Sequence, residues 1–257
     1  MLSSEQVEHF IEKGFVKIGN AFSRSIASQA RDLLWKKIDL DPGNPSEWTR
    51  PVIRIGEMSD EPFSLAVNTP ALLEAFDQLA GDNWVPRHSL GSFPIRFPSQ
   101  QIPGDTGWHV DASFPGKDPV NYLEWRINFN SRGRALLMLF LFSDVSDDDA
   151  PTRLKEGSHF DVAKILSTKG DDGLSCVELA EELPLTTKRK ECLATGESGT
   201  VFLCHPFLVH AAQVHRGKNP KFMAQPPLIS KRDFQPNRPF ERCCAVEKAI
   251  QMAMHEH

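Results

Sequence analysis

Two residue types that bind metal ions occur close together in the segment Gly107-Trp108-His109-Val110-Asp111. Alternate side chains of an extended strand point to the same face, so we expect His109 and Asp111 to lie side by side. An imidazole and a carboxylate in this arrangement can both reach one cation. A second histidine would complete the two-histidine, one-carboxylate set that holds non-haem Fe(II) and leaves coordination positions open. The segment therefore predicts a metal site that is completed from elsewhere in the chain.

Histidines that could complete the site lie further along the chain. The pattern from Thr200 to His210 is that of a strand and a turn, and it carries two candidates, His205 and His210. His215 follows the turn. The residue pattern alone leaves open which of these imidazoles completes the metal site.

A carboxylate ligand that chelates the metal would also need a cation deeper in the site, to hold its far end. Arginine is best suited because its planar fork binds a carboxylate through two nitrogens, but lysine can also form the ion pair. Lys221 opens a predicted strand in which it shares a face with Met223 and Gln225. Arg216 lies shortly before that strand. These two basic residues are the candidate anchors.

The composition excludes several classes of protein. The 257 residues are 40% hydrophobic and 25% charged, which is typical of a globular chain with a sizeable core. A formal net charge of -5 argues against nucleic acid or an anionic membrane as a partner, and we expect no obligate protein partner. Five cysteines without paired spacing indicate reduced thiols, and the first residues lack the features of a signal peptide. We therefore expect a cytoplasmic protein.

Helices are predicted at both ends of the chain, where apolar residues recur at helical spacing. These helices are predicted to begin near Ser3, Ser23, Thr69 and Arg238. A strand over 15–18 follows the first of them. We therefore expect 1–83 to form a helical shell and 231–257 to contain a C-terminal helix.

Short extended runs separated by proline and glycine fill the middle of the chain. They cover 88–97, 108–111, 125–130, 134–142, 200–204 and 221–225. The run from Leu136 to Phe142 is continuously apolar, as in a strand that is buried on both faces. This pattern predicts a mainly β fold with flanking helices, a cupin-like jelly roll or double-stranded β-helix. We expect 84–230 to form its core within one domain that spans 1–257.

Several of these segments, taken in order, resemble the phytanoyl-CoA dioxygenase family. The motifs are Trp108-His109-Val110-Asp111, then Pro151-Thr152-Arg153 with Gly157-Ser158-His159, then His210-Ala211-Ala212 with a basic residue eleven positions on. The resemblance in order and spacing runs from near residue 5 to about residue 227. Members of that family are Fe(II)- and 2-oxoglutarate-dependent oxygenases with a double-stranded β-helix core.

The resemblance implies a role for each matching position. His109 and Asp111 would be the first two iron ligands and His210 the third. The residue that pairs with the C5 carboxylate of 2-oxoglutarate falls on Lys221, where the family usually has arginine, and Arg216 is the second candidate. Related halogenases have a small residue at the position of Asp111. The carboxylate therefore implies hydroxylation or another oxygen transfer to a small organic substrate, with release of succinate and CO2.

Two other functions fit the same residues. A non-catalytic jelly-roll protein could keep the metal as a sensor, and the lysine at position 221 is consistent with that reading. A cupin-type metal enzyme without 2-oxoglutarate would need additional histidine ligands, for which His205 or His215 would have to reach the metal.

The residues that recognise the substrate are not specified by any motif, since loops carry such contacts. Trp108, Arg153 and His159 are candidates for touching the substrate or supporting the metal ligands. The loops 98–106, 114–123 and 168–193 are expected to wall the pocket.

Overall fold

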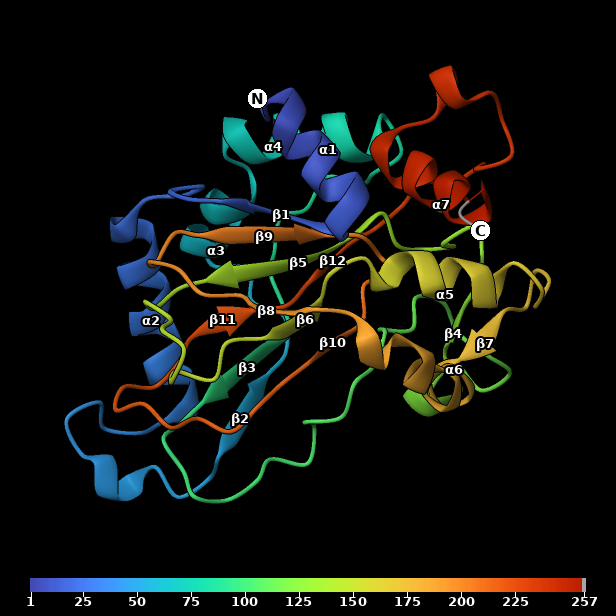
Figure 1. The fold of residues 1–257 in the computed structure, drawn as a ribbon. Helices are drawn as coiled ribbons and strands as arrows, with labels where there is room; N and C mark the ends of the chain where they lie inside the picture. The colour runs from blue at the N-terminus through green and yellow to red at the C-terminus, as the bar shows by residue number, and fades with distance from the viewer. Residues whose placement is uncertain (256–257) are drawn as a thin grey trace.

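The strands of the described residues, 1–255, form antiparallel sheets in this computed structural model (Figure 1). The largest sheet has the order β1-β9-β5-β11, and β12 also pairs with β5. Its strands are β1 (Phe15–Ile18), β5 (Leu136–Leu141), β9 (Val201–Cys204), β11 (Met223–Ala224) and β12 (Pro227–Leu228).

A second sheet has the order β10-β6-β8, and two further strand pairs are β2-β3 and β4-β7. These strands are β2 (Val52–Ile55), β3 (Phe93–Arg96), β4 (Arg126–Ile127), β6 (Arg153–Lys155), β7 (Leu174–Ser175), β8 (Glu191–Leu193) and β10 (His210–Ala211). An isolated bridge between Arg96 and Lys221 joins β3 to the chain just before β11, and another joins His109 to His210.

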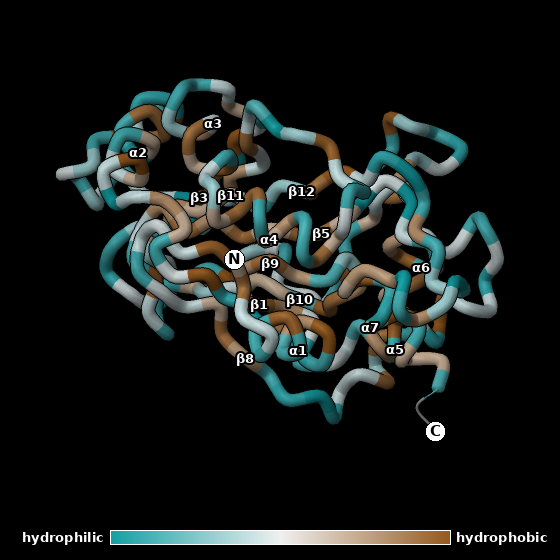
Figure 2. The backbone as a smooth tube through the Cα atoms, turned by 90° about the horizontal axis from the view of Figure 1, so that it is seen from above, coloured by the Kyte–Doolittle hydropathy of each residue, from teal (hydrophilic) through white to brown (hydrophobic). Residues whose placement is uncertain are grey.

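Seven α-helices surround the sheets in the described chain. They are α1 (Ser4–Lys13), α2 (Arg24–Ile38), α3 (Glu61–Val67), α4 (Pro70–Ala80), α5 (Ser158–Leu166), α6 (Cys176–Glu182) and α7 (Ala245–His255). Helices α1, α4 and α7 lie on the side of β1 and β9 that faces away from the second sheet (Figure 1). Seen from above, hydrophilic segments run along the periphery of this arrangement (Figure 2). No helix among the described residues is long and apolar enough to span a bilayer.

Strand β5 separates two layers of the hydrophobic core. Leu137, Leu139 and Leu141 join a cluster with Phe202 and Met223 on one face. The alternating side chains on the other face pack into the cluster formed with the helices, and they are Leu136, Met138 and Phe140. The prediction of a strand buried on both faces is confirmed, because every residue of β5 is buried.

The predicted C-terminal helix is shorter than expected. Helix α7 begins at Ala245 rather than near Arg238, since a 3-10 turn over Phe240–Arg242 precedes it. The carboxylate of Glu247 accepts a hydrogen bond from the backbone N–H of Cys244 (3.0 Å). It thereby satisfies a backbone N–H group that has no partner within the helix at the N-terminus of α7. Residues 256 and 257 of the predicted segment lie outside the described residues.

The predicted strands are also shorter than expected, and some helices and strands were not predicted from the sequence. The run 108–111 forms a single bridge at His109 and is otherwise irregular. The segment 1–83 supplies strands β1 and β2 in addition to its helices. Helix α3 and strands β6 and β8 had no distinct periodic signal because they are short.

Candidate metal centre

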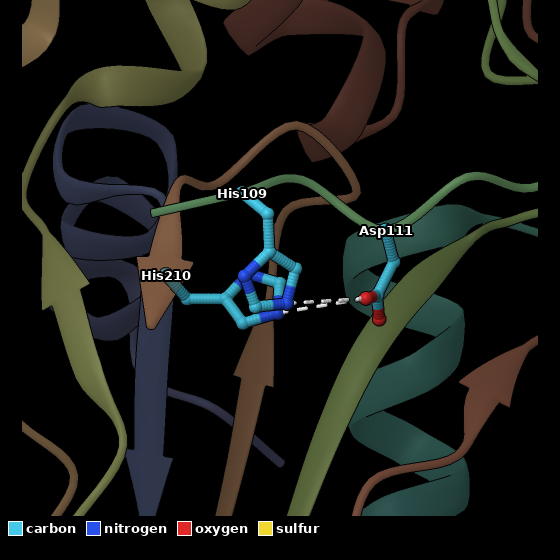
Figure 3. A group of neighbouring side chains, drawn as sticks. All are labelled: His109, Asp111 and His210. Carbon is cyan, nitrogen blue, oxygen red and sulfur yellow. Dashed lines mark ion pairs between the residues drawn. The ribbon is translucent and has the colours of Figure 1, made fainter. Parts of the chain in front are cut away.

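The side chains of His109 and His210 lie next to each other because their backbones pair directly. Each residue donates its N–H to the carbonyl oxygen of the other, and both N···O distances are 3.0 Å. The ring centroids are 4.4 Å apart. Asp111 faces both rings, with its Oδ1 at 3.6 Å from His109 Nε2 and 3.7 Å from His210 Nε2 (Figure 3). The three possible ligand atoms lie within 4.8 Å of one another, so one ion can contact all of them.

Hydrogen bonds to backbone carbonyls orient both imidazoles. His109 Nδ1 lies 2.9 Å from the carbonyl oxygen of Gly107, and His210 Nδ1 lies 3.0 Å from that of Leu208. Since a carbonyl oxygen only accepts, each Nδ1 carries the proton and each Nε2 presents its lone pair. Burial, reinforced by His210, lowers the pKa of His109 and keeps that ring neutral. Imidazoles whose Nε2 atoms face a common point are suited to bind a metal, and the side-chain amide nitrogen of Gln225 lies 3.2 Å from His210 Nε2.

Arg134 fixes the carboxylate of Asp111. Its Nη1 donates to Asp111 Oδ2 (2.9 Å), and its Nη2 donates to the carbonyl oxygen of Ala112 (2.8 Å). The other oxygen, Oδ1, is left facing the histidines. Burial would raise the pKa of Asp111, but Arg134 and the two imidazoles outweigh it and hold that pKa well below its usual range. The donor set of two imidazoles and one carboxylate fits Fe(II) or a similar divalent ion.

A cavity of about 510 Å³ opens onto these ligand atoms. Besides the triad, its polar lining residues are Arg54, Ser92, Arg96, Asp105, Tyr122, Arg134, Thr152 and Gln225. Tyr122 stacks near Trp125 at one wall, with ring centroids 5.5 Å apart. Burial and the nearby Asp111 raise the pKa of Tyr122 to about 12, so its phenol stays protonated. Asp105 and Tyr122 come from two of the loops that were expected to wall the pocket.

The two predicted anchors do not line this cavity. Lys221 is buried, and its Nζ donates to the carbonyl oxygen of Ala150. Burial, reinforced by Arg96, lowers its pKa well below the usual range. Arg216 is exposed and borders a separate surface groove. The basic residue that reaches the cavity next to Lys221 is its backbone partner Arg96.

Trp108 and Arg153 lie on the outer face of the ligand-bearing segments. The guanidinium of Arg153 stacks on the Trp108 ring at 4.4 Å, and Lys155 approaches the same ring at 4.5 Å. Arg153 Nη2 donates to the carbonyl oxygens of Thr106 (3.0 Å) and Ala212 (3.4 Å). Because side chains alternate, residues 108 and 153 point away from the triad while 109 points toward it. Arg153 therefore joins the two segments that carry the histidines without facing the cavity.

The remaining histidines lie away from the triad. His159 is buried, with Nε2 at 2.8 Å from the carbonyl oxygen of Ile11, and its ring centroid is 4.9 Å from that of His205. His205 Nδ1 accepts the N–H of Phe207 (3.1 Å), and His215 Nδ1 accepts that of Gly217 (3.1 Å). Neither His205 nor His215 joins the metal-ligating group found among the described residues. The metal enzyme with additional histidine ligands is therefore not supported.

The fold of the chain is similar to that of several solved structures. The chain is similar to the non-haem α-ketoglutarate-dependent carbocyclase SnoK from nogalamycin biosynthesis, at 17% identity and a TM-score of 0.57 over 90% of this chain and 84% of that one. It is similar to HygX from Streptomyces hygroscopicus with nickel and 2-oxoglutarate bound, at 17% identity and 0.55 over 88% and 86%. It is also similar to EctD from S. alaskensis with 2-oxoglutarate and 5-hydroxyectoine, at 16% and 0.56 over 95% and 86%.

The chain shares the fold of these enzymes. No family model matches the sequence, and no curated protein matches it either. The resemblance to the phytanoyl-CoA dioxygenase family therefore stays a prediction, while the broader likeness to metal- and 2-oxoglutarate-dependent enzymes is carried by the fold.

Sequence reasoning missed Arg54, Arg96 and Asp105, which line the cavity together. Arg96 did carry a signal. It sits between Ile95 and Phe97 in an apolar run, where an arginine needs a buried partner. The partner, Asp105, lies in a loop whose direction no periodic pattern reveals.

Proposed function

We propose that this protein is an Fe(II)- and 2-oxoglutarate-dependent oxygenase that acts on a small organic substrate. The observation that carries the proposal is the direct pairing of His109 with His210, which brings two Nε2 atoms and Asp111 Oδ1 to one point at a cavity wall. The similar solved structures support the class, and they support a cupin-like double-stranded β-helix as the architecture of the two main sheets. The three ligand roles and the family remain part of the proposal.

The chain's own residues would hold the metal and the cosubstrate. Iron bound at the triad together with 2-oxoglutarate would supply activated oxygen, with succinate and CO2 as products. His109, Asp111 and His210 would occupy one side of the ion and leave the cavity side open. Arg96 is better placed than Lys221 to pair with the C5 carboxylate, since it lines the cavity and has a bidentate fork.

The cavity walls favour a small substrate. A volume of about 510 Å³ must accommodate the cosubstrate as well. Tyr122 and Trp125 offer an aromatic wall against which a substrate can pack. Arg134 would keep Asp111 ionised and oriented throughout, because it holds Oδ2 and leaves Oδ1 for the metal. We propose hydroxylation as the outcome, although SnoK is named a carbocyclase and shows that this fold carries other oxidative reactions.

The test is a succinate assay with Fe(II), ascorbate, O2 and 2-oxoglutarate across a panel of small substrates. We expect the wild-type protein to form succinate, and His109→Ala and Asp111→Ala to abolish it. Exposed His88→Ala is the matched control and should retain activity. Succinate formation by both triad variants at the wild-type rate would end the assignment.

The sensor hypothesis makes the opposite prediction. A non-catalytic metal protein would bind Fe(II) and show no 2-oxoglutarate-dependent succinate with any substrate. The similar structures do not favour it, since they include enzymes with 2-oxoglutarate bound. Calorimetric binding of 2-oxoglutarate to the iron-loaded protein separates the two hypotheses before any substrate is known.

A further inference from the structure

A carboxylate of the chain itself occupies the basic end of the cavity. Arg96 holds Asp105 with both terminal nitrogens, at 3.2 Å (Nη1–Oδ1) and 2.6 Å (Nη2–Oδ2). Arg54 contacts the same Oδ2. All three side chains line the cavity that contains the triad. Proteins bind small carboxylates through the same bidentate pairing, so Asp105 sits where an acidic ligand would bind.

The charges at this end of the cavity are not balanced. Two guanidinium groups, from Arg54 and Arg96, face one carboxylate, and Lys221 is paired with Arg96 through the backbone. The Arg96 side chain is 5% exposed, so it has lost most of its hydration, while that of Arg54 is 53% exposed and faces the opening. The excess of guanidinium groups over carboxylates favours a further anion.

Asp105 lies in the segment 98–107, which contributes no residue to the two core clusters, and Pro103, two positions before Asp105, is the buried residue of that segment. The segment is anchored near one end where Ser99 N–H donates to His215 O (3.3 Å) and near the other where Thr106 O accepts from Arg153 (3.0 Å). Between the anchors the segment forms no helix or strand, and Ile102 is 76% exposed. The tether that Asp105 provides to β2 and β3 is therefore the contact that a competing ligand would break.

We propose that Asp105 is a built-in competitor for a carboxylate ligand of this cavity, which must displace it from Arg96 and thereby frees the segment 98–107 beside the metal. The inference rests on the proposed function and adds a determinant of affinity to it. The ligand carboxylate has two possible sources, the far end of 2-oxoglutarate or an acidic primary substrate. In both cases removal of the Asp105 charge strengthens ligand binding. The ligand binds only the molecules in which Asp105 has left Arg96, so the apparent affinity rises when that fraction of molecules rises.

The experiment measures ligand binding to anaerobic, Fe(II)-loaded wild type and Asp105→Asn by calorimetry. We expect the variant to bind 2-oxoglutarate roughly 3- to 10-fold more tightly, which corresponds to a partly exposed ion pair of order 1 kcal/mol. 2-Oxobutyrate, which keeps the metal-chelating keto acid but lacks the far carboxylate, should bind both proteins equally. Asp161→Asn is the matched control because it removes another bidentate pair, to Arg189 at 2.8 and 2.7 Å, outside the cavity.

Glutarate distinguishes the two sources and does not depend on metal chelation by a keto acid. If it binds the variant more tightly only when 2-oxoglutarate is absent, the displaced carboxylate belongs to the cosubstrate site. If the gain persists in the presence of saturating 2-oxoglutarate, the site serves an acidic primary substrate. Both results support Asp105 as a competitor of the ligand. Asp105→Ser provides a second variant if Asp105→Asn has a lowered melting temperature.

Equal or weaker binding of both 2-oxoglutarate and glutarate by a folded Asp105→Asn overturns the inference, because Asp105 would then orient Arg96 for the ligand. A wild-type protein that binds glutarate but never 2-oxoglutarate contradicts the proposed function instead. The glutarate comparison still tests the competitor in that case.

Discussion

His109 and His210 exchange two backbone hydrogen bonds, each with an N···O distance of 3.0 Å, and this pairing places their imidazoles on the same face of adjacent segments. In antiparallel pairs, directly opposite residues have neighbouring side chains, so the backbone itself sets the spacing of two metal ligands. The Nδ1 hydrogen bonds to Gly107 and Leu208 then set the ring orientation. The three candidate ligands are thus held close together by contacts of the chain itself.

If His109, Asp111 and His210 bind a metal as proposed, the metal should stabilise the fold, and each of the three ligands should be needed for the effect. We expect Fe(II) or Mn(II) to raise the melting temperature of the wild-type protein, since a ligand at 100 times its dissociation constant adds about 2.7 kcal/mol. His210→Ala should lose this shift. Exposed His88→Ala should keep it. Metal titrations followed by differential scanning fluorimetry provide the measurement, and a full shift in His210→Ala would show that the ion binds elsewhere.

Arg134 predicts a second effect on the metal. It holds Asp111 Oδ2 at 2.9 Å while Oδ1 faces the histidines. We expect Arg134→Leu to weaken metal binding about 10- to 100-fold, as loss of a group that orients a ligand usually does. Arg132→Leu removes a nearby arginine whose partner is the surface residue Asp233 (3.1 Å), and it should leave metal affinity unchanged. Competition with a chromogenic chelator measures both. Equal metal affinities of Arg134→Leu and the wild-type protein would show that other contacts hold Asp111.

The sequence allowed His109 and Asp111 to be paired because their spacing has a direct physical meaning, whereas His210 was singled out only by the family resemblance. Positions 109 and 111 share a face in any extended segment, whether or not the full strand forms, and only a bridge at His109 was needed. The run in β5 was equally informative, since an apolar residue at every position requires burial on both faces. Such local rules hold without knowledge of the partner segments.

The residues at the basic end of the cavity could not be predicted from the sequence, because their positions depend on which strands pair. Lys221 lies just before β11, and its ammonium donates to the carbonyl oxygen of Ala150. Arg96 reaches the cavity instead, and this depends on the pairing of two strands distant in the chain. Hydrophobic period cannot specify which strand lies beside which. A pair of ligands two positions apart can be proposed from spacing, whereas a contact made by the sheet order cannot.

Buried neutral histidines predict how stability depends on pH. Burial lowers the pKa of His159 to about 4, whereas its value in the unfolded chain is near 6.5. The unfolded state therefore binds a proton first as the pH falls, so the stability contributed by neutral His159 is complete above pH 6.5 and decreases toward pH 4. The loss reaches about 3 kcal/mol for this group. His205, whose pKa is also lowered by burial, acts in the same direction.

Urea unfolding at a series of pH values from 7.5 to 4.5 measures this dependence. His159→Gln should be less stable than wild type at pH 7.5 but lose less stability on acidification, because it removes one titrating group. Exposed His88→Gln should follow the wild-type slope. Parallel curves for wild type and His159→Gln would mean that the pKa of His159 is the same in the folded and the unfolded state.

The position of Arg153 predicts a structural role rather than contact with substrate. Its guanidinium stacks on Trp108 at 4.4 Å and donates to the carbonyls of Thr106 and Ala212, which flank the two histidine-bearing segments. We expect Arg153→Ala to lower the free energy of unfolding by about 2 kcal/mol, since it removes a cation–π contact and two charge-assisted hydrogen bonds. Metal affinity should fall with it, because the segments that carry His109 and His210 lose a shared support.

The readout that separates the two roles is kinetic. If Arg153 supports the ligand segments, saturating Fe(II) should restore most of the succinate-forming rate of Arg153→Ala, and the KM for substrate should stay close to wild type. Arg153→Lys should recover part of the metal affinity, since it keeps a cation over Trp108 but lacks the fork that reaches both carbonyls. A large rise in substrate KM at saturating metal would instead place Arg153 at the substrate, which its orientation away from the cavity argues against.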